Sequence, residues 1–254
     1  PGQYYYWKVR AYNDDSYTEW TSQYEQFTVA IPTASLVYSK YLGSSSESGV
    51  TMLDPNTLYT AASGSVNRYM GNGNLEYNLQ VNGSIISSTT VTPDHRVYIA
   101  SSDNNLYAFN ENGVSVSGWP VALGSQLAAS VAIDDNHNLY LGTSNGIYQC
   151  ISAKGEILWS YNVGASVLAS SAITNDNVLF VINSNGRIFA FDLNTVDANN
   201  PQPIWTLETN HPIDNSPAVL NNSIIVSTHD GYLLKVENKG TFGELTLELP
   251  TNGK

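Results

Sequence analysis

Charged residues are scarce in this chain of 254 residues. They make up 13% of the sequence, and only 10 are Lys or Arg against 22 that are Asp or Glu, which gives a net charge of −12. An average soluble domain has roughly 25% charged residues. Proteins bind nucleic acid by neutralising phosphates with clustered Lys and Arg. This composition therefore argues against a nucleic-acid partner and against docking on anionic membranes.

Cysteine is nearly absent, and no long hydrophobic run occurs. Cys150 is the only cysteine, so the chain can form neither an internal disulfide nor a Cys-rich metal site. It stands in an apolar segment, where we expect an inert buried thiol. No run approaches the roughly 18 apolar residues of a membrane span, which argues against membrane insertion.

Residues 125–164 have the pattern of four short strands joined by turns. The expected strands are 128–133, 139–142, 147–151 and 157–163. Apolar residues alternate along them, so we expect half-buried strands. The Asn145-Gly146 pair is typical of a tight type I′ hairpin turn, which needs positive φ at both residues. A lone four-stranded sheet cannot bury both faces, and similar neighbours are therefore expected.

The same pattern recurs with a period near 40 residues, which indicates a repeat protein. The expected units are 44–83, 84–124, 125–164, 165–210 and 211–250. Equivalent positions carry Ser88, Ser130, Ser170 and Ser216 in the first strand, Tyr59, Tyr98, Tyr140 and Phe180 in the second, and Trp119, Trp159 and Trp205 in the fourth, where the first unit has Tyr77. The sequence thus predicts an all-β fold of four-stranded antiparallel sheets.

Each unit resembles the PQQ-type, or quinoprotein-like, repeat. The resemblance rests on 216–219 (Ser-Pro-Ala-Val), Asp230-Gly231, 106–110, 188–192 and the three Trp. It implies a β-propeller over residues 34–254. Residues 36–43 match a fourth strand that lacks its first three. We therefore expect a fragment, cut at both ends, of a propeller with at least six blades, whose open edges allow edge-to-edge self-association.

Residues 1–33 resemble the last two strands of a fibronectin type III domain, followed by a linker at 30–33. The matching residues are Tyr5, Tyr6, Trp7, Val9, Ala11, Trp20, Thr21, Phe27 and Val29. The earlier strands of such a sandwich are missing from the sequence. We expect a partial β-sandwich segment here, of the kind that serves as a spacer in extracellular and surface proteins.

The PQQ-type resemblance implies two kinds of function. Its dehydrogenases bind pyrroloquinoline quinone and calcium, commonly beside a vicinal Cys-Cys disulfide that a single cysteine cannot form. Its other branch is non-catalytic and uses blades and loops as docking surfaces. We expect a binding or scaffolding module that is extracellular, on the cell surface or in the periplasm, without cofactor, with a protein or neutral glycan as ligand. A fragment of a PQQ-dependent oxidoreductase and a propeller-type carbohydrate-active enzyme remain open alternatives.

No residue is assigned a catalytic or metal-binding role. The four histidines, His95, His137, His211 and His229, fall at turns or unit starts, where solvated turn residues are expected. Residues 134–138 (Asp-Asp-Asn-His-Asn) resemble a calcium loop but lack the EF-hand spacing and its terminal Glu, so they are interpreted as a polar turn. The repeated Trp are interpreted as packing between blades rather than as a sugar platform. The first-strand Ser and the polar turns are candidates for contact with a neutral polar ligand.

Overall fold

The computed structural model describes residues 4–7, 25–28, 50–54, 56–62, 64–127 and 129–251. It divides the chain into two units, Pro1–Ser39 and Lys40–Lys254. In the first unit, β1 (Tyr4–Trp7) and β2 (Glu25–Thr28) pair antiparallel. One hairpin is common to many β folds, so the fibronectin-like resemblance stays a prediction. The rest of that motif and the strand expected at 36–43 lie outside the described residues.

The described residues of the second unit form five four-stranded antiparallel sheets, here called blades 1 to 5, each made of four consecutive strands. Blade 1 has β3 (Thr51–Asp54), β4 (Thr57–Ala62), β5 (Ser65–Met70) and β6 (Leu75–Gln80), and blade 2 has β7 (Thr90–Val91), β8 (Val97–Ala100), β9 (Asn105–Phe109) and β10 (Val121–Ala122). Blade 3 has β11 (Ala132–Ile133), β12 (Leu139–Gly142), β13 (Ile147–Ile151) and β14 (Ile157–Asn162). Blade 4 has β15 (Ala172–Ile173), β16 (Val178–Ile182), β17 (Arg187–Asp192) and β18 (Trp205–Glu208), and blade 5 has β19 (Ala218–Leu220), β20 (Ser223–Ser227), β21 (Tyr232–Asn238) and β22 (Gly243–Pro250).

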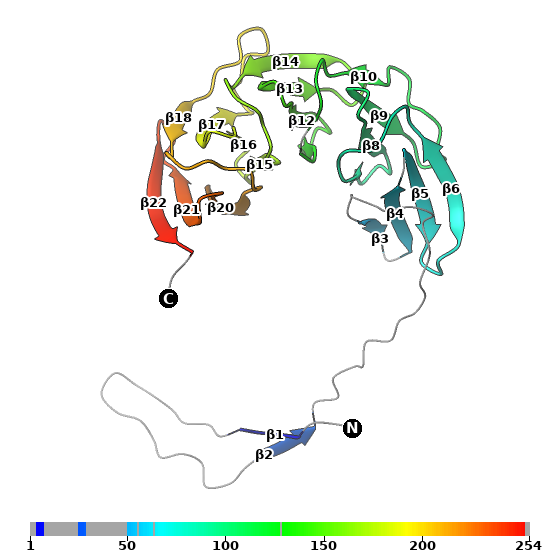
Figure 1. The fold of residues 1–254 in the computed structure, drawn as a ribbon, viewed down its shortest axis with the longest axis horizontal. Helices are drawn as coiled ribbons and strands as arrows, with labels where there is room; N and C mark the ends of the chain where they lie inside the picture. The colour runs from blue at the N-terminus through cyan, green and yellow to red at the C-terminus, as the bar shows by residue number, and fades with distance from the viewer. Residues whose placement is uncertain are drawn as a thin grey trace. The chain divides into compact units, whose positions relative to one another are not determined.

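The blades follow one another in chain order around an arc, as Figure 1 shows. The early strands of each blade lie on the inner side of the arc and the fourth strands form its outer rim. The strand order within every sheet follows the sequence. The predicted all-β architecture of four-stranded antiparallel blades is therefore confirmed.

The hydrophobic core is divided among the interfaces between consecutive blades. Four clusters of buried side chains occur, and each draws its members from two neighbouring blades. In β8, Val97 and Ile99 belong to the cluster shared with blade 1, whereas Tyr98 and Ala100 belong to the cluster shared with blade 3. Alternate residues of one strand thus serve two interfaces, because successive side chains point to opposite faces of a sheet.

The expectation of half-buried strands is wrong for the middle strands. All four residues of β12 are buried, as are all five residues of β16. Both faces of these strands are covered by neighbouring blades, so the sequence forms a nearly continuous apolar run there. The expected first strand at 128–133 is also too long, since β11 contains only Ala132 and Ile133.

The turn at Asn145-Gly146 is not the predicted type I′ hairpin. Among its residues only Gly146 has a positive φ, of 81°. The Gly146 amide donates to the Thr143 carbonyl, and the Thr143 amide donates to the Ile147 carbonyl. These hydrogen bonds define a hairpin loop longer than two residues, in which the residue that follows the turn has a left-handed backbone conformation. The Asn145 side chain supports the loop by accepting from the Thr143 hydroxyl at 2.6 Å.

Apolar side chains are exposed on the first and last blades. Met52 in blade 1 is 61% exposed, and Leu249 in blade 5 is 49% exposed. The expected self-association of open edges stays a prediction. Within the described part of the chain, no helix is both long and apolar enough to cross a membrane.

Candidate binding surface

The three repeated Trp are buried between blades. Each ring packs against the aromatic residue of the second strand in its own blade, with Tyr98–Trp119, Tyr140–Trp159 and Phe180–Trp205 centroid distances of 5.3, 6.0 and 5.7 Å. Trp119 precedes β10 rather than lying in it, and Pro120 follows. Proline has no N–H to donate to a strand ladder, which accounts for the late start of β10.

Each of these Trp also reaches the next blade. Trp205 Nε1 donates to Asn238 Oδ1 of blade 5 at 2.8 Å, and Trp119 Nε1 donates to the Ala153 carbonyl of blade 3 at 3.4 Å. The Trp159 ring stacks on Phe191 of blade 4 at 5.5 Å. In blade 1, the Tyr77 hydroxyl donates to a blade 2 carbonyl, that of Glu111. These contacts agree with the interpretation as inter-blade packing and leave no open aromatic platform for a sugar.

Three of the four repeated Ser residues, Ser130, Ser170 and Ser216, also connect blades. They lie two residues before the first strands instead of within them. The Ser130 amide donates to Ser170 Oγ at 3.0 Å, and the Ser170 amide donates to Ser216 Oγ at 2.9 Å. Hydroxyls spent on satisfying backbone amides of the preceding blade are poor candidates for nucleophiles or ligand contacts.

Cys150 lies in β13, is 1% exposed, and is a free thiol. Burial raises its pKa to about 12, and the adjacent Tyr140 hydroxyl offsets this only in part. The thiolate is the reactive form, so its population near pH 8 is negligible. We expect no labelling by a disulfide reagent in the native protein and one equivalent after unfolding in denaturant. Rapid labelling of the native protein would contradict a closed interface between blades 3 and 4.

The turns between first and second strands, and those between third and fourth strands, share one edge of every sheet; we call this edge the upper face. It carries the two repeat-equivalent histidines. His95 and His137 both occupy left-handed turn positions, with φ of 64° and 60°. His95 Nδ1 lies 3.4 Å from Glu111 Oε2, and His137 Nδ1 lies 3.8 Å from Asp94 Oδ2 of the neighbouring blade. Both are partly exposed turn residues.

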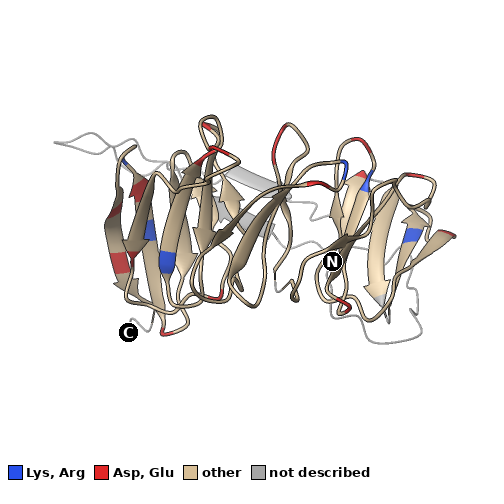
Figure 2. Ribbon diagram, turned by 90° about the horizontal axis from the view of Figure 1, so that it is seen from above, with Lys and Arg blue, Asp and Glu red and all other residues tan. Residues whose placement is uncertain are grey.

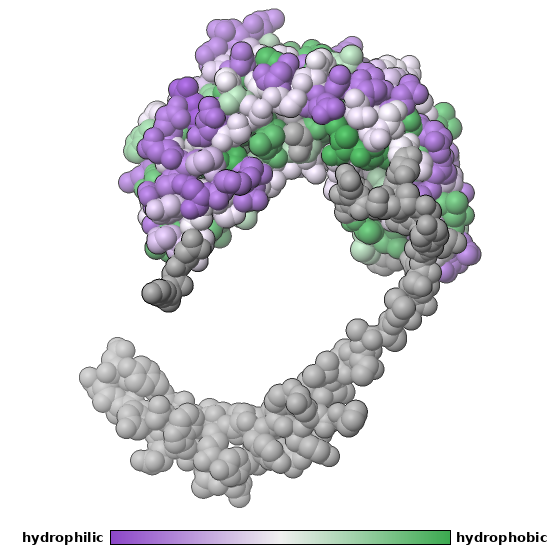
Figure 3. All heavy atoms as spheres, viewed as in Figure 1, coloured by the Kyte–Doolittle hydropathy of each residue, from purple (hydrophilic) through white to green (hydrophobic). Residues whose placement is uncertain are grey.

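Acidic residues concentrate in loops at the ends of the strands, while most of each strand is uncharged (Figure 2). On the face seen in Figure 3, hydrophilic residues cover much of the outer part of the blades, and hydrophobic residues gather nearer the inner side of the arc. The exposed polar groups are therefore mainly hydrogen-bonding and acidic side chains of the turns, and the strands that carry these turns are largely uncharged.

The calcium-like loop at 134–138 has no free carboxylate at its first position. Asp134 Oδ1 accepts from the amides of Asn136 and Asn138, and Oδ2 accepts from the Tyr140 hydroxyl at 2.9 Å and from the Asn138 amide group at 3.0 Å. The carboxylate thus closes a polar turn. Among the described residues, no group of three or more His, Cys, Asp or Glu is placed to hold a metal ion.

A small polar cavity opens on the upper face between blades 3 and 4. Its volume is about 230 Å³, and its wall is formed by Ile133, Asp134, Asp135, Ile173, Thr174, Asn175 and Asn177. Asp135 is exposed, whereas Asp134 and Thr174 are committed to turn hydrogen bonds. The Asp135 carboxylate and the Asn175 amide would suit a cationic or hydrogen-bonding side chain. Sequence reasoning missed this cavity, although both walls are equivalent turns of the repeat.

The remaining histidines lie at the opposite edge of blade 5. His229 is 72% exposed and its Nδ1 lies 3.0 Å from Asp214 Oδ2. His211 is different: its side chain is 13% exposed and lies between Asp230 and Glu248. No local sequence pattern predicts this grouping, because Asp230 and Glu248 lie 19 and 37 residues from His211.

Comparison with known proteins agrees with this geometry. A family model described as "Outer membrane protein assembly factor BamB" matches residues 115–199, which include all of blade 3. Residues 115–199 thus match a PQQ-type repeat family, and the chain has a β-propeller fold. The BamB crystal structure from Moraxella catarrhalis superposes with a TM-score of 0.69 at 18% identity, over 84% of this chain and 65% of that one.

A second solved structure that matches is that of the computationally designed Ika8 protein. It superposes with a TM-score of 0.66 at 14% identity, over 78% of this chain and 60% of that chain. No curated protein sequence matched the chain. The chain spans less than two thirds of the length of either structure, and such low identities show a shared fold only.

Proposed function

We propose that this propeller is a non-catalytic binding or scaffolding module that holds other proteins through its upper face. The observation that carries the proposal is the use of the repeated side chains. The three Trp rings, which could have formed a sugar platform, make contacts between blades, as do the hydroxyls of Ser170 and Ser216, which could have supplied nucleophiles. The exposed turns and the cavity beside Asp135 are then the groups left to meet a partner.

The family match supports the same conclusion. Its model is described as an outer membrane protein assembly factor, and we infer that the present chain acts in the bacterial envelope, at the cell surface or in the periplasm, in a comparable scaffolding role. A rigid blade frame that displays adaptable polar turns is well suited to protein recognition. We further propose that the module works without pyrroloquinoline quinone or calcium.

Site-specific photo-crosslinking in the envelope of a bacterial host would test the docking face. A benzophenone side chain at Asp135 or Asn175 should give discrete crosslinked protein products. The same group at Asn145 or Asn185, on turns between second and third strands at the opposite edge, is the matched control and should give few. Equal crosslinking from both edges would refute the assignment of the upper face.

Two assays on the purified chain separate this proposal from its alternatives. Dye reduction with added pyrroloquinoline quinone and calcium should stay at background, and the thermal midpoint should be unchanged, because a ligand that binds the native state stabilises it. Binding to a glycan array should also stay at background. Quinone-dependent turnover or strong glycan binding would replace the scaffolding proposal with the corresponding alternative.

A further inference from the structure

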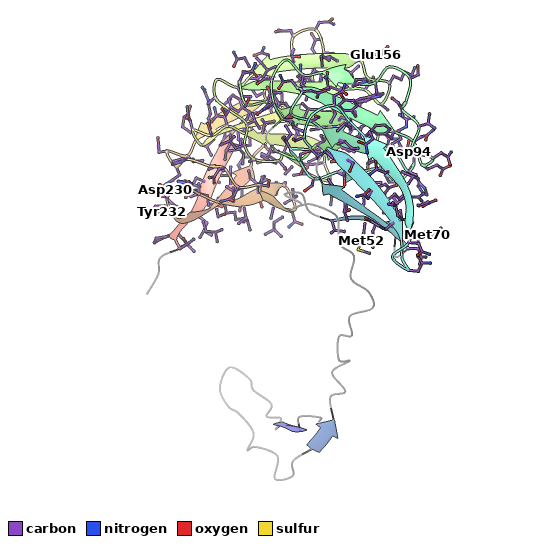
Figure 4. The ribbon with its side chains drawn as sticks, turned by 45° about the vertical axis from the view of Figure 1, so that its right-hand side comes forward. Met52, Met70, Asp94, Glu156, Asp230 and Tyr232 are labelled. Atoms are coloured by element: carbon purple, nitrogen blue, oxygen red, sulfur yellow. The ribbon has the colours of Figure 1, made fainter. Side chains whose placement is uncertain are left out.

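A partly buried histidine joins three segments of the chain at the lower edge of blade 5. His211 lies in the connection between β18 and β19, Asp230 lies in the turn between β20 and β21, and Glu248 belongs to the outermost strand, β22. Figure 4 shows Asp230 and Tyr232 together at the edge of this blade. The histidine is therefore placed where the last blade meets the chain arriving from blade 4.

Both ring nitrogens of His211 face a carboxylate. Nδ1 lies 2.7 Å from Asp230 Oδ2, and Nε2 lies 3.3 Å from Glu248 Oε1. A neutral imidazole carries one N–H, so one of the two carboxylates would meet a ring lone pair. Only the imidazolium can donate to both. The Tyr232 ring, with its centroid 4.3 Å from that of the imidazole, covers one side.

The backbone of His211 is held in place by blade 4. The His211 amide donates to Thr209 Oγ1 at 3.3 Å, and the same hydroxyl lies 2.8 Å from the Gly186 carbonyl in the turn between β16 and β17. The His229 amide in turn donates to the Pro212 carbonyl, which ties the Asp230 turn to the connection. The ring is therefore presented to its two carboxylates by a fixed support.

The other charged groups near this cluster are already paired with one another. His229 pairs with Asp214, and Arg187 of blade 4 pairs with Glu208 at 3.0 Å. Among the described residues, the groups in contact with the His211 ring are the two carboxylates and the Tyr232 side chain. With the imidazolium the cluster of His211, Asp230 and Glu248 has a net charge of −1, and with neutral imidazole it has −2.

We propose that His211 is a proton-controlled latch. When protonated, it fastens β22 and the turn that carries Asp230 to the connection from blade 4. When it loses its proton, one of the two hydrogen bonds is lost and local opening of β22 becomes easier, although the strand stays paired with β21. Blade 5 is therefore held more firmly at mildly acidic than at alkaline pH.

The direction of the pH dependence follows from the electrostatics. The hydrogen bond with Asp230 raises the pKa of His211 above its ordinary value of 6.5, and burial opposes this only in part. The pKa of Asp230 is lowered, chiefly by the Thr228 hydroxyl and then by His211, so its carboxylate stays charged over the same range. The stabilisation is complete below pH 6.5 and is lost as the pH rises through the higher folded-state pKa.

The test is an NMR titration of the His ring protons combined with hydrogen exchange of residues 243–250. His211 should titrate above 6.5, and Glu248→Gln should lower its midpoint because one carboxylate charge is removed. After correction for intrinsic exchange, the protection factors of the β22 amides should be at least roughly threefold higher at about pH 5.5 than at about pH 8.5. His211→Gln should abolish that ratio.

His229→Gln is the matched control, because His229 also pairs with an aspartate but is largely exposed. It should keep the wild-type ratio of protection. A His211 midpoint at or below 6.5 in the wild-type protein would overturn the proposal, even if His211→Gln failed to fold. An unchanged ratio in a folded His211→Gln variant would overturn it equally.

Discussion

Replacing Gly186 by Ala is expected to destabilise blades 4 and 5 severely. Gly186 has a φ of +82°, and a Cβ placed on it would overlap the His211 carbonyl oxygen and lie 2.7 Å from Thr209 Oγ1. The left-handed backbone alone costs an L-residue about 1 kcal/mol. The clash is with backbone, which cannot turn aside, so overpacking adds about 1–3 kcal/mol or more. We expect a total loss of about 3 kcal/mol, measured by urea unfolding.

Gly164→Ala is the matched control for this prediction. Gly164 has nearly the same φ, +81°, but an added Cβ would meet nothing within 4 Å. It should therefore lose only the backbone contribution of about 1 kcal/mol. Equal losses in the two variants would show that the close approach of the blade 4 turn to the His211 connection does not contribute to stability.

Replacing Trp205 by Ala is expected to have the largest effect of any single side-chain truncation in blade 4. Trp205 is 6% exposed, packs on Phe180 at 5.7 Å, and donates to Asn238 of blade 5. Removing a buried Trp costs about 3–5 kcal/mol in lost burial and residual cavity. The expected result is a fall of that size in the free energy of unfolding, followed by circular dichroism in denaturant.

Trp205→Phe separates the hydrogen bond from the packing. Asn238 Oδ1 also accepts from the Gly240 amide at 3.0 Å, so the loss of the indole donor does not leave it without a partner. We expect a loss of about 1–2 kcal/mol from the hydrogen bond and the smaller ring. A Phe variant as unstable as the Ala variant would mean that the N–H group, rather than ring volume, joins blades 4 and 5.

The strand pattern could be predicted because the repeat supplies several independent copies of each position. The second and third strands of blade 3, Leu139–Gly142 and Ile147–Ile151, occur where apolar residues and turn residues placed them. The first strands were overestimated, because Ser130 bonds to the next blade rather than to its own sheet. That contact depends on a residue 40 positions away and leaves no local signature.

Most of the candidate functional groups are harder to predict, because their contacts join residues that are far apart in the sequence. Asp134 could be recognised as a turn residue, since its hydrogen-bond partners lie within six positions. The His211 cluster joins residues up to 37 positions apart through the fold of blade 5. The cavity beside Asp135 likewise exists only because two blades stand next to each other. Spacing along the chain carries no information about such contacts.

The division of the core among neighbouring blades has a consequence for how this chain should unfold. Each described hydrophobic cluster joins two consecutive blades, so stability is close to a sum of blade terms and nearest-neighbour coupling terms. Blade 5 has one such coupling, to blade 4, whereas blade 3 has two. The unfolding of one blade then directly affects only its neighbours. Unfolding should begin at the weakly coupled blades and proceed inward, as in a linear array of repeats rather than a globular domain.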